Sequence, residues 1–263
     1  MPTVRTGPLI GLIGQVVLFA ALAGTVGLST AGWLAGIAYG GVTCAALTRG
    51  LHRSGAVALG PADRVTLTRA TLAGGVAALT ADSFTRPAPV AVLVGLAAVA
   101  LVLDGVDGWV ARRTGTASAL GARFDMEIDA FLVLVLSVYA ARPMGAWVLA
   151  IGGMRYAFAA AAWVLPWFGA SLPPRYWRKV VAAAQGVGLV VAAGGVLPRP
   201  LSSAVLAVSL ALLIESFGRD VAWLWYQRPA VSGAAARHRR GVRLDGPRSL
   251  APPRAQPSGA ATR

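Results

Sequence analysis

The sequence predicts an all-α, polytopic integral membrane protein, and three observations support this prediction. The chain of 263 residues is 56% hydrophobic and only 13% charged, whereas soluble domains contain roughly 25% charged residues. Its mean hydropathy is +0.66. Its long apolar segments lack the alternation of strands, and a span in lipid must satisfy its own backbone hydrogen bonds. A disordered chain and a disulfide scaffold are excluded, the latter because Cys44 is the only cysteine.

The charge-free segments divide into two N-terminal spans and six later ones. No charged residue occurs between Arg5 and Arg49, which is long enough for two helices of about 20 residues. A turn near Ser29 and Thr30 would make residues 1–55 a hairpin, and the run is too long for the competing signal peptide. A core over residues 61–227 is expected to contain the spans Thr66–Ala81, Pro89–Val110, Leu120–Ala141, Ala146–Leu165, Val180–Leu197 and Ser203–Trp225.

The placement of basic residues predicts the orientation of these spans. Lys179 is the sole lysine among the 24 basic residues, and the net charge is +14. Most arginines fall in alternate loops, within 49–69, 112–123, 175–179 and the C-terminal segment, whereas the opposite loops hold only Arg86, Arg142 and Arg199. Because Arg-rich loops stay cytoplasmic, both termini are expected in the cytoplasm. Arg-rich, Lys-poor usage is compatible with a GC-rich bacterial source and thus with a plasma membrane protein.

The last 36 residues, 228–263, form a distinct basic segment. They contain eight arginines and a single acid, Asp245, and they lack any apolar period. We expect this tail to be disordered on the membrane surface. Anionic lipid accounts for its charge, so no nucleic-acid partner is expected.

Half of the ten acidic residues fall in one short stretch, as Asp104, Asp107, Asp125, Glu127 and Asp129. On helices, Asp104 and Asp107 share one face, and Asp125 and Asp129 share another. Glu127 is turned roughly 160° away from the second pair. Two antiparallel helices would bring the four aspartates to the cytoplasmic end of the bundle. Four close carboxylates repel unless a cation intervenes, and all-oxygen ligands suit Mg²⁺, Mn²⁺ or Ca²⁺.

The acidic stretch carries the motif D-x-x-D-G-x-x-A-R, eight residues, then G-x-x-x-D-x-x-x-D. Its fixed positions are Asp104, Asp107, Gly108, Ala111, Arg112, Gly121, Asp125 and Asp129. This pattern resembles the signature of the CDP-alcohol phosphatidyltransferase family, with every position and spacing filled. The resemblance covers about Pro61 to Arg219 and implies the family's six-helix core. Upstream, P-A-D-R-V-T-L-T-R is similar to the family's P-N-x-x-T-x-x-R, with Thr66 and Arg69 matching and Asp63 in place of Asn.

The resemblance implies a reaction and a set of site residues. Similar proteins move the phosphatidyl group of a CDP-linked lipid, usually CDP-diacylglycerol, onto an alcohol and release CMP. By this resemblance Asp104, Asp107, Asp125 and Asp129 hold two divalent cations, Mg²⁺ or Mn²⁺, and Asp129 also takes the proton of the attacking hydroxyl. Contacts to the CDP-alcohol are implied for Thr66, Arg69, Gly108, Ala111, Arg112, Ser118 and Gly121. A homodimer is usual in families that the chain resembles.

Four further basic residues are candidates for binding an anionic acceptor such as a polyol phosphate. Arg175, Arg178 and Lys179 lie at the cytoplasmic start of a helix, although positive-inside flanking explains them almost as well. Arg155 lies mid-span, where a charged side chain needs a partner. Glu215 is its expected partner if its role is structural.

Two other functions stay open at this point. A transferase that moves the group of a soluble CDP-alcohol onto a lipid acceptor would use the same motif. A divalent-cation transporter could use the four aspartates as a translocation site. This function does not explain the fixed spacing of the other motif positions, Gly108, Ala111, Arg112 and Gly121. The sequence does not choose among inositol phosphate, glycerol phosphate, serine and another lipid as the acceptor.

Overall fold

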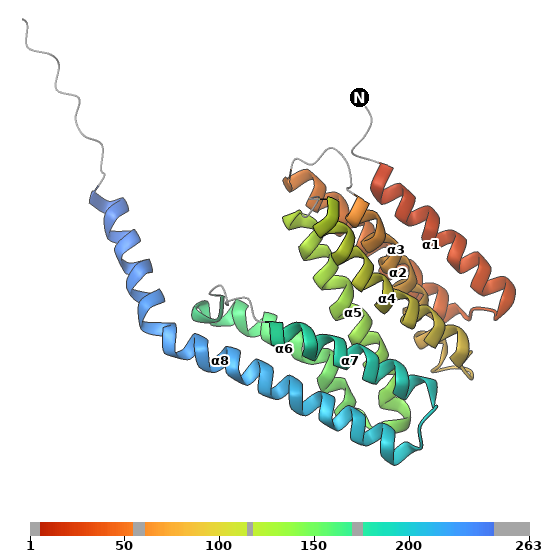
Figure 1. The fold of residues 1–263 in the computed structure, drawn as a ribbon. Helices are drawn as coiled ribbons and strands as arrows, with labels where there is room; N and C mark the ends of the chain where they lie inside the picture. The colour runs from red at the N-terminus through yellow and green to blue at the C-terminus, as the bar shows by residue number, and fades with distance from the viewer. Residues whose placement is uncertain (1–5, 55–60, 115–117, 170–175, 245–263) are drawn as a thin grey trace, which may run out of the picture.

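The computed structural model describes residues 6–54, 61–114, 118–169 and 176–244, and within these ranges it contains helices and connections but no strand (Figure 1). The all-α prediction is therefore confirmed. In chain order the elements are α1 (Thr6–Thr25), α2 (Thr30–Ser54), α3 (Pro61–Asp82), α4 (Val90–Thr114), α5 (Ala119–Met144), the 3₁₀ turn η1 (Ala146–Val148), α6 (Leu149–Val164), the 3₁₀ turn η2 (Pro166–Gly169), α7 (Tyr176–Gly194) and α8 (Arg199–Leu244).

Five of the described helices are long and apolar enough to cross a membrane, which confirms a polytopic membrane protein. These segments are Gly7–Thr25, Thr30–Arg53, Val90–Val110, Ala146–Val164 and Arg199–Gln227. Three other expected spans, in α3, α5 and α7, are not among these segments. They carry charged residues, among them Arg69 in α3, Asp129 in α5 and Arg178 in α7. Each of these three helices packs against several others. Arg69 is buried between them, whereas the side chains of Asp129 and Arg178 are 40% and 32% exposed.

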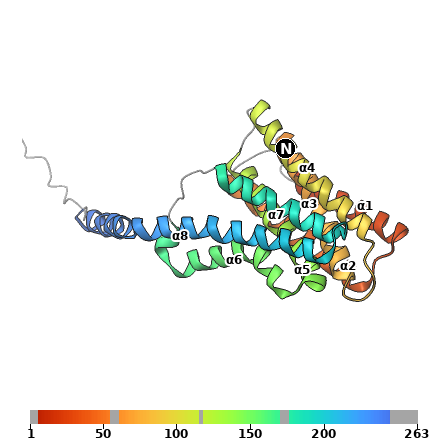
Figure 2. The same ribbon diagram turned by 60° about the horizontal axis from the view of Figure 1, so that its bottom comes forward.

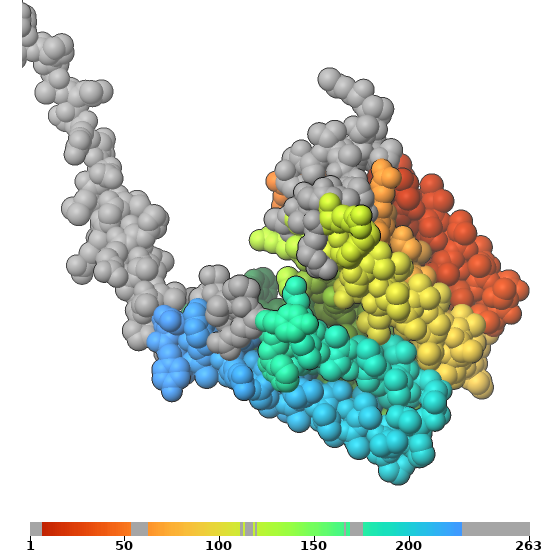
Figure 3. Space-filling model, viewed as in Figure 1, coloured from red at the N-terminus to blue at the C-terminus, as the bar shows by residue number. Residues whose placement is uncertain are grey.

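Helix α3 is the centre of the bundle. It packs against α1, α2, α4 and α5, and its small side chains Ala73, Val76 and Ala78 are fully buried. Helices α4, α7 and α8 lie side by side on the face shown in Figure 3, and Figure 2 shows α8 running along α7. The buried core extends into these helices through Leu93, Leu189 and Leu206.

Helices α5 and α6 approach most closely at Gly152. A Cβ atom on Gly152 would collide with the Cα atom of Leu134 and would come within 3.0 Å of the Ser137 hydroxyl oxygen. A backbone atom cannot move aside as a flexible side chain can, so only glycine allows this spacing. The contact fixes the position of α6 beside α5.

The N-terminal hairpin is joined to the core through Asp82, the last residue of α3. Its carboxylate accepts hydrogen bonds from the Ser29 backbone N–H at 3.0 Å, the Ser29 hydroxyl at 2.5 Å and the Gly32 N–H at 3.1 Å. It thereby caps the positive end of α2, and the Nε–H of Arg86 donates to it at 2.9 Å. Gly27 adopts a φ of +72° in the connection from α1, as glycine readily does. The predicted hairpin with a turn near Ser29 is confirmed.

Helix α8 is longer than the sequence analysis expects. The predicted span ends at Trp225 and disorder is expected from residue 228, but the helix continues to Leu244. The helix thus includes residues 228–244, and the expected disorder of the tail on the membrane surface stays a prediction. Ala and Arg are good helix formers, and extending an existing helix requires no new nucleation. Residues 245–263 of the expected tail lie outside the described residues.

Candidate active site

The two predicted acidic faces lie next to each other in the structure. Asp104 and Asp107 project from α4, and Asp125 and Asp129 project from the first turns of α5. All four carboxylates contact one guanidinium group, that of Arg69 on α3. Its Nη1 lies 2.7 Å from Asp107 Oδ2, and its Nη2 lies 2.9 Å from Asp104 Oδ1. Asp125 and Asp129 pair with Nη1 and Nη2, respectively. The structure thus brings together the four aspartates, as their spacing predicts.

Arg69 and Thr66 both belong to this aspartate cluster. The Arg69 side chain is 1% exposed, and its Nε–H donates to the Ala100 carbonyl at 3.2 Å. The Thr66 hydroxyl donates to Asp107 Oδ2 at 3.2 Å. The sequence predicts that both residues contact the CDP-alcohol, but its motif does not indicate that Arg69 pairs with all four aspartates or that Thr66 binds Asp107. Their contact with the nucleotide stays a prediction.

The donor set of the cluster fits a divalent cation. Carboxylate oxygens of Asp104, Asp107 and Asp125 lie within 4.8 Å of one another, and such oxygens are the ligands that Mg²⁺ and Mn²⁺ prefer. One guanidinium neutralises only one of the four negative charges, so the cluster retains an excess of negative charge that a cation would balance. Asp107 is 6% exposed, whereas Asp104 is 43% exposed. The cluster is therefore enclosed on one side and accessible on the other.

The remaining motif residues lie where α4 ends and α5 begins. Gly108, Ala111 and Arg112 continue α4 beyond Asp107, and the side chains of Ala111 and Arg112 lie outside the described part of the structure. Their contacts with the CDP-alcohol therefore stay predictions.

Ser118 and Gly121 shape the first turn of α5. Ser118 is the N-cap residue, and its hydroxyl oxygen accepts a hydrogen bond from the Gly121 N–H at 2.8 Å. A Cβ atom on Gly121 would collide with the Asp63 carboxylate and would come within 2.9 Å of the Ser118 hydroxyl oxygen. These contacts give both residues a structural role, in addition to their predicted contact with the nucleotide.

A cavity of about 400 Å³ lies between α5, α6, α7 and α8, next to the aspartate cluster. We call it the α5–α8 cavity. Of the four clustered aspartates, only Asp129 lines it, so Asp129 faces the cluster and the cavity together. The other charged or polar residues that line the cavity are Arg155, Arg178, Gln185, Ser216 and Asp220.

Two of the four basic residues predicted to bind the acceptor line this cavity. Arg155 enters it from α6 and Arg178 from α7. The Arg178 Nε atom lies 3.4 Å from Asp220 Oδ2. Lys179 is exposed and does not line the cavity, whereas Arg175 lies outside the described residues.

The expected pairing of Arg155 with Glu215 is wrong. The Nη2–H of Arg155 donates instead to Glu127 Oε1, at 2.5 Å. Glu215 pairs with Arg219 and accepts a hydrogen bond from Trp177 Nε1 at 2.9 Å. On α5, Glu127 points away from the two aspartates, toward α6, and this places it within reach of Arg155.

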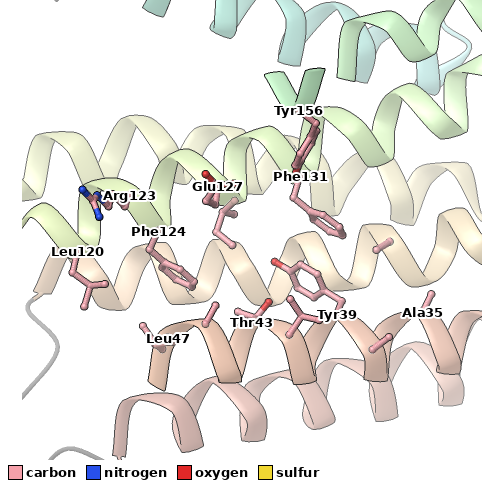
Figure 4. Close-up of a pocket in the computed structure, with 15 residues that line it drawn as sticks. Ala35, Tyr39, Thr43, Leu47, Leu120, Arg123, Phe124, Glu127, Phe131 and Tyr156 are labelled. Carbon is pink, nitrogen blue, oxygen red and sulfur yellow. The ribbon is translucent and has the colours of Figure 1, made fainter. Parts of the chain in front are cut away.

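A larger groove of about 700 Å³ is lined mainly by residues of α2 and α5 (Figure 4). We call it the α2–α5 groove. Its walls are mostly apolar, and the rings of Tyr39 and Phe131 stack there with centroids 4.4 Å apart. Arg123 and Glu127 are the charged residues that line it. None of the clustered aspartates lines this groove, whereas Asp129 lines the α5–α8 cavity.

Gln185 and Ser216 line the α5–α8 cavity from α7 and α8, although no sequence motif marks either residue. Both are buried, with 6% and 5% of their surface exposed. A single polar residue within an apolar helix has no spacing partner to mark it as functional. Glutamine is rare within an apolar helix, which is the only indication that Gln185 is unusual. This rarity does not predict which cavity the side chain lines.

The match to known families agrees with this geometry. A family model described as CDP-alcohol phosphatidyltransferase matches residues 59–215, which are more than half of the chain. The matched segment contains Arg69, the four aspartates and Arg155. No curated protein and no solved structure matches the chain in the corresponding searches. The chain belongs to the CDP-alcohol phosphatidyltransferase family.

Proposed function

We propose that this protein transfers the phosphatidyl group of CDP-diacylglycerol to an anionic alcohol acceptor and releases CMP, as a step of phospholipid biosynthesis. Family membership implies the transfer of a phosphatidyl-type group from a CDP-alcohol. The position of Asp129 carries the proposal, because this residue belongs to the aspartate cluster and lines the adjacent cavity. An acceptor hydroxyl bound in that cavity would lie next to the Asp129 carboxylate. It would also lie next to the aspartate cluster, where the donor is proposed to bind.

Asp104, Asp107, Asp125 and Asp129 would hold two divalent cations, Mg²⁺ or Mn²⁺. When bound, such ions neutralise charge on the phosphate oxygens of the donor. The converging carboxylates and their uncompensated negative charge support this assignment. Thr66, Gly108, Arg112 and Ser118 are proposed to contact the cytidine diphosphate at the same end of the bundle.

In the proposed reaction, Asp129 accepts the proton of the acceptor hydroxyl as its oxygen attacks the lipid-bearing phosphorus of the donor. A new bond forms between this oxygen and the phosphorus. The bond between the phosphorus and the bridging oxygen of the pyrophosphate breaks, and CMP leaves with the electron pair. Arg155 and Arg178 bind the anionic group of the acceptor and orient its hydroxyl toward Asp129.

We place the site at the cytoplasmic face of a bacterial plasma membrane. Successive helices alternate in direction, so the C-terminal ends of α2, α4, α6 and α8 lie at one end of the bundle. The helix ends on this side and the C-terminal segment carry most of the arginines, in agreement with the positive-inside rule. A soluble CDP-alcohol donor and a homodimeric assembly are compatible with this arrangement.

The decisive experiment is CMP release by the purified full-length protein in lipid nanodiscs. CDP-diacylglycerol and Mg²⁺ or Mn²⁺ are supplied with inositol phosphate, glycerol 3-phosphate, serine or diacylglycerol. We expect CMP release with a phosphorylated acceptor, and none after chelation of the divalent ion. Turnover only with a soluble CDP-alcohol and diacylglycerol would assign the alternative transferase reaction. Mn²⁺ uptake by proteoliposomes without CMP release would assign transport.

A further inference from the structure

Gln185 is a buried polar side chain without a hydrogen-bonding role in the protein's described interior. It is 6% exposed on α7. Its amide nitrogen Nε2 is fully buried and has no hydrogen-bond partner among the described residues. A buried amide without a partner is unfavourable, so such a group in a cavity is suited to bind a ligand atom that supplies the missing partner.

The position of Gln185 indicates which ligand that is. Arg178, Val181, Ala182 and Gln185 lie on one face of α7, and all four line the α5–α8 cavity. Gln185 therefore shares this cavity with Asp129, the proposed base, and with Arg178, a proposed anchor for the acceptor's charge.

Glutamine differs from these neighbours because it is neutral and offers a donor and an acceptor in one group. It suits a hydroxyl group, which also donates and accepts, better than it suits an anion. We propose that Gln185 binds a second, non-reacting hydroxyl of the acceptor and so selects a phosphorylated polyol over a phosphorylated alcohol with one hydroxyl. This inference rests on the proposed function and deepens it, because it names a residue that determines acceptor specificity.

The chain supplies a matched control in Gln15. Gln15 on α1 is also buried, at 7% exposed, and its Nε2 likewise has no partner among the described residues. It faces α3 at Gly74, in a space of only about 20 Å³ that contains none of the four clustered aspartates. An unpaired buried amide therefore does not by itself indicate a ligand site. Gln185 differs from Gln15 because it lines the same cavity as Asp129.

The test compares two acceptors with the full-length protein in nanodiscs. The probes are glycerol 3-phosphate and 3-hydroxypropyl phosphate, which lacks the second hydroxyl, and an inositol phosphate with its deoxy analogue forms a second pair. We expect the unmodified protein to favour the polyol of the active pair by about tenfold in kcat/KM, the effect of one hydrogen bond. Equal use of both members of that pair overturns the inference without any variant having to fold.

The variants Gln185→Met and Gln185→Leu should raise the KM of the polyol phosphate by about tenfold. They should leave the KM of CDP-diacylglycerol and of the one-hydroxyl analogue unchanged. Gln15→Met should change none of these values. Equal losses with both acceptors, or the same loss for Gln15→Met, would overturn the inference. Absence of CMP release with every acceptor contradicts the proposed function, whereas CMP release that is indifferent to Gln185 contradicts only this inference.

Discussion

Arg155 on α6 and Glu127 on α5 form an ion pair between the two spaces that flank α5. Arg155 lines the α5–α8 cavity, and Glu127 lines the α2–α5 groove. Their side chains are 35% and 59% exposed in the structure, so the pair is not buried between the helices. Arg155 is therefore accessible from the cavity and can exchange Glu127 for an anionic ligand there.

Replacement of Arg155 should therefore impair acceptor binding. We expect Arg155→Ala to raise the KM of the phosphorylated acceptor about tenfold or more, because it removes a charge-assisted hydrogen bond. The KM of CDP-diacylglycerol should change little, since the cavity is separate from the nucleotide contacts. Initial rates of CMP release with each substrate varied in turn measure both values.

Glu127→Gln is the control for this prediction. It removes the ion pair but keeps Arg155, so the KM of the acceptor should stay the same or fall. If the double variant Glu127→Gln, Arg155→Ala recovers the original KM, Arg155 serves to neutralise Glu127 and does not bind the acceptor.

The change Asp129→Asn should abolish transfer while the protein stays folded. An amide cannot take the hydroxyl proton, and a general base contributes about 10²–10⁴-fold to the rate. The measurement is CMP release, with the elution profile in detergent as the test of folding. Glu215→Gln, an acidic position outside the cluster, should retain activity. Near-normal turnover of Asp129→Asn contradicts the assigned role.

The loss of Arg69 should make stability depend on divalent cations. In Arg69→Met, four carboxylates meet without their guanidinium, and breaking a buried ion pair costs roughly 3–5 kcal/mol. Partial exposure of Asp104, Asp125 and Asp129 reduces this cost. We expect the Tm in EDTA to fall and Mg²⁺ to raise it more than in the unmodified protein, because the ion binds only the folded state. Arg123→Met, outside the cluster, should show no greater Mg²⁺ response than the unmodified protein.

Asp82 should make the stability of the hairpin sensitive to acid. It lies beyond the expected span Thr66–Ala81, and although burial alone would raise its pKa, hydrogen bonds from Ser29 and Arg86 hold the pKa of Asp82 below its usual range. Its contribution to stability is therefore fully present above the unfolded pKa of about 3.9 and is lost as the pH falls through the lower folded value. The Tm of the unmodified protein should exceed that of Asp82→Asn at neutral pH.

The pH series in detergent distinguishes this mechanism from a general acid effect. The Tm difference between the unmodified protein and Asp82→Asn should be constant above about pH 5 and should shrink below pH 4. A difference that persists unchanged at pH 3 would show that the lost hydrogen-bond geometry, and not the charge, carries the effect.

The sequence by itself predicted the helical membrane fold, the hairpin and the convergence of four aspartates. These features depend on local composition and on the 3.6-residue period, which place Asp104 with Asp107 and Asp125 with Asp129 on helix faces. A motif with fixed spacing was also enough to identify the family. These features can be predicted from the sequence because each is determined within one helix or within two consecutive helices.

Only the tertiary structure decided how side chains from distant helices combine. It places Arg69 among the aspartates and pairs Arg155 with Glu127 in preference to Glu215. It also places Gln185 in the wall of the α5–α8 cavity. These outcomes depend on helix rotation and separation, which contacts such as that of Gly152 with the α5 backbone determine. Charge and periodicity show that a buried ion needs a partner, but packing between helices far apart in the chain decides which partner is within reach.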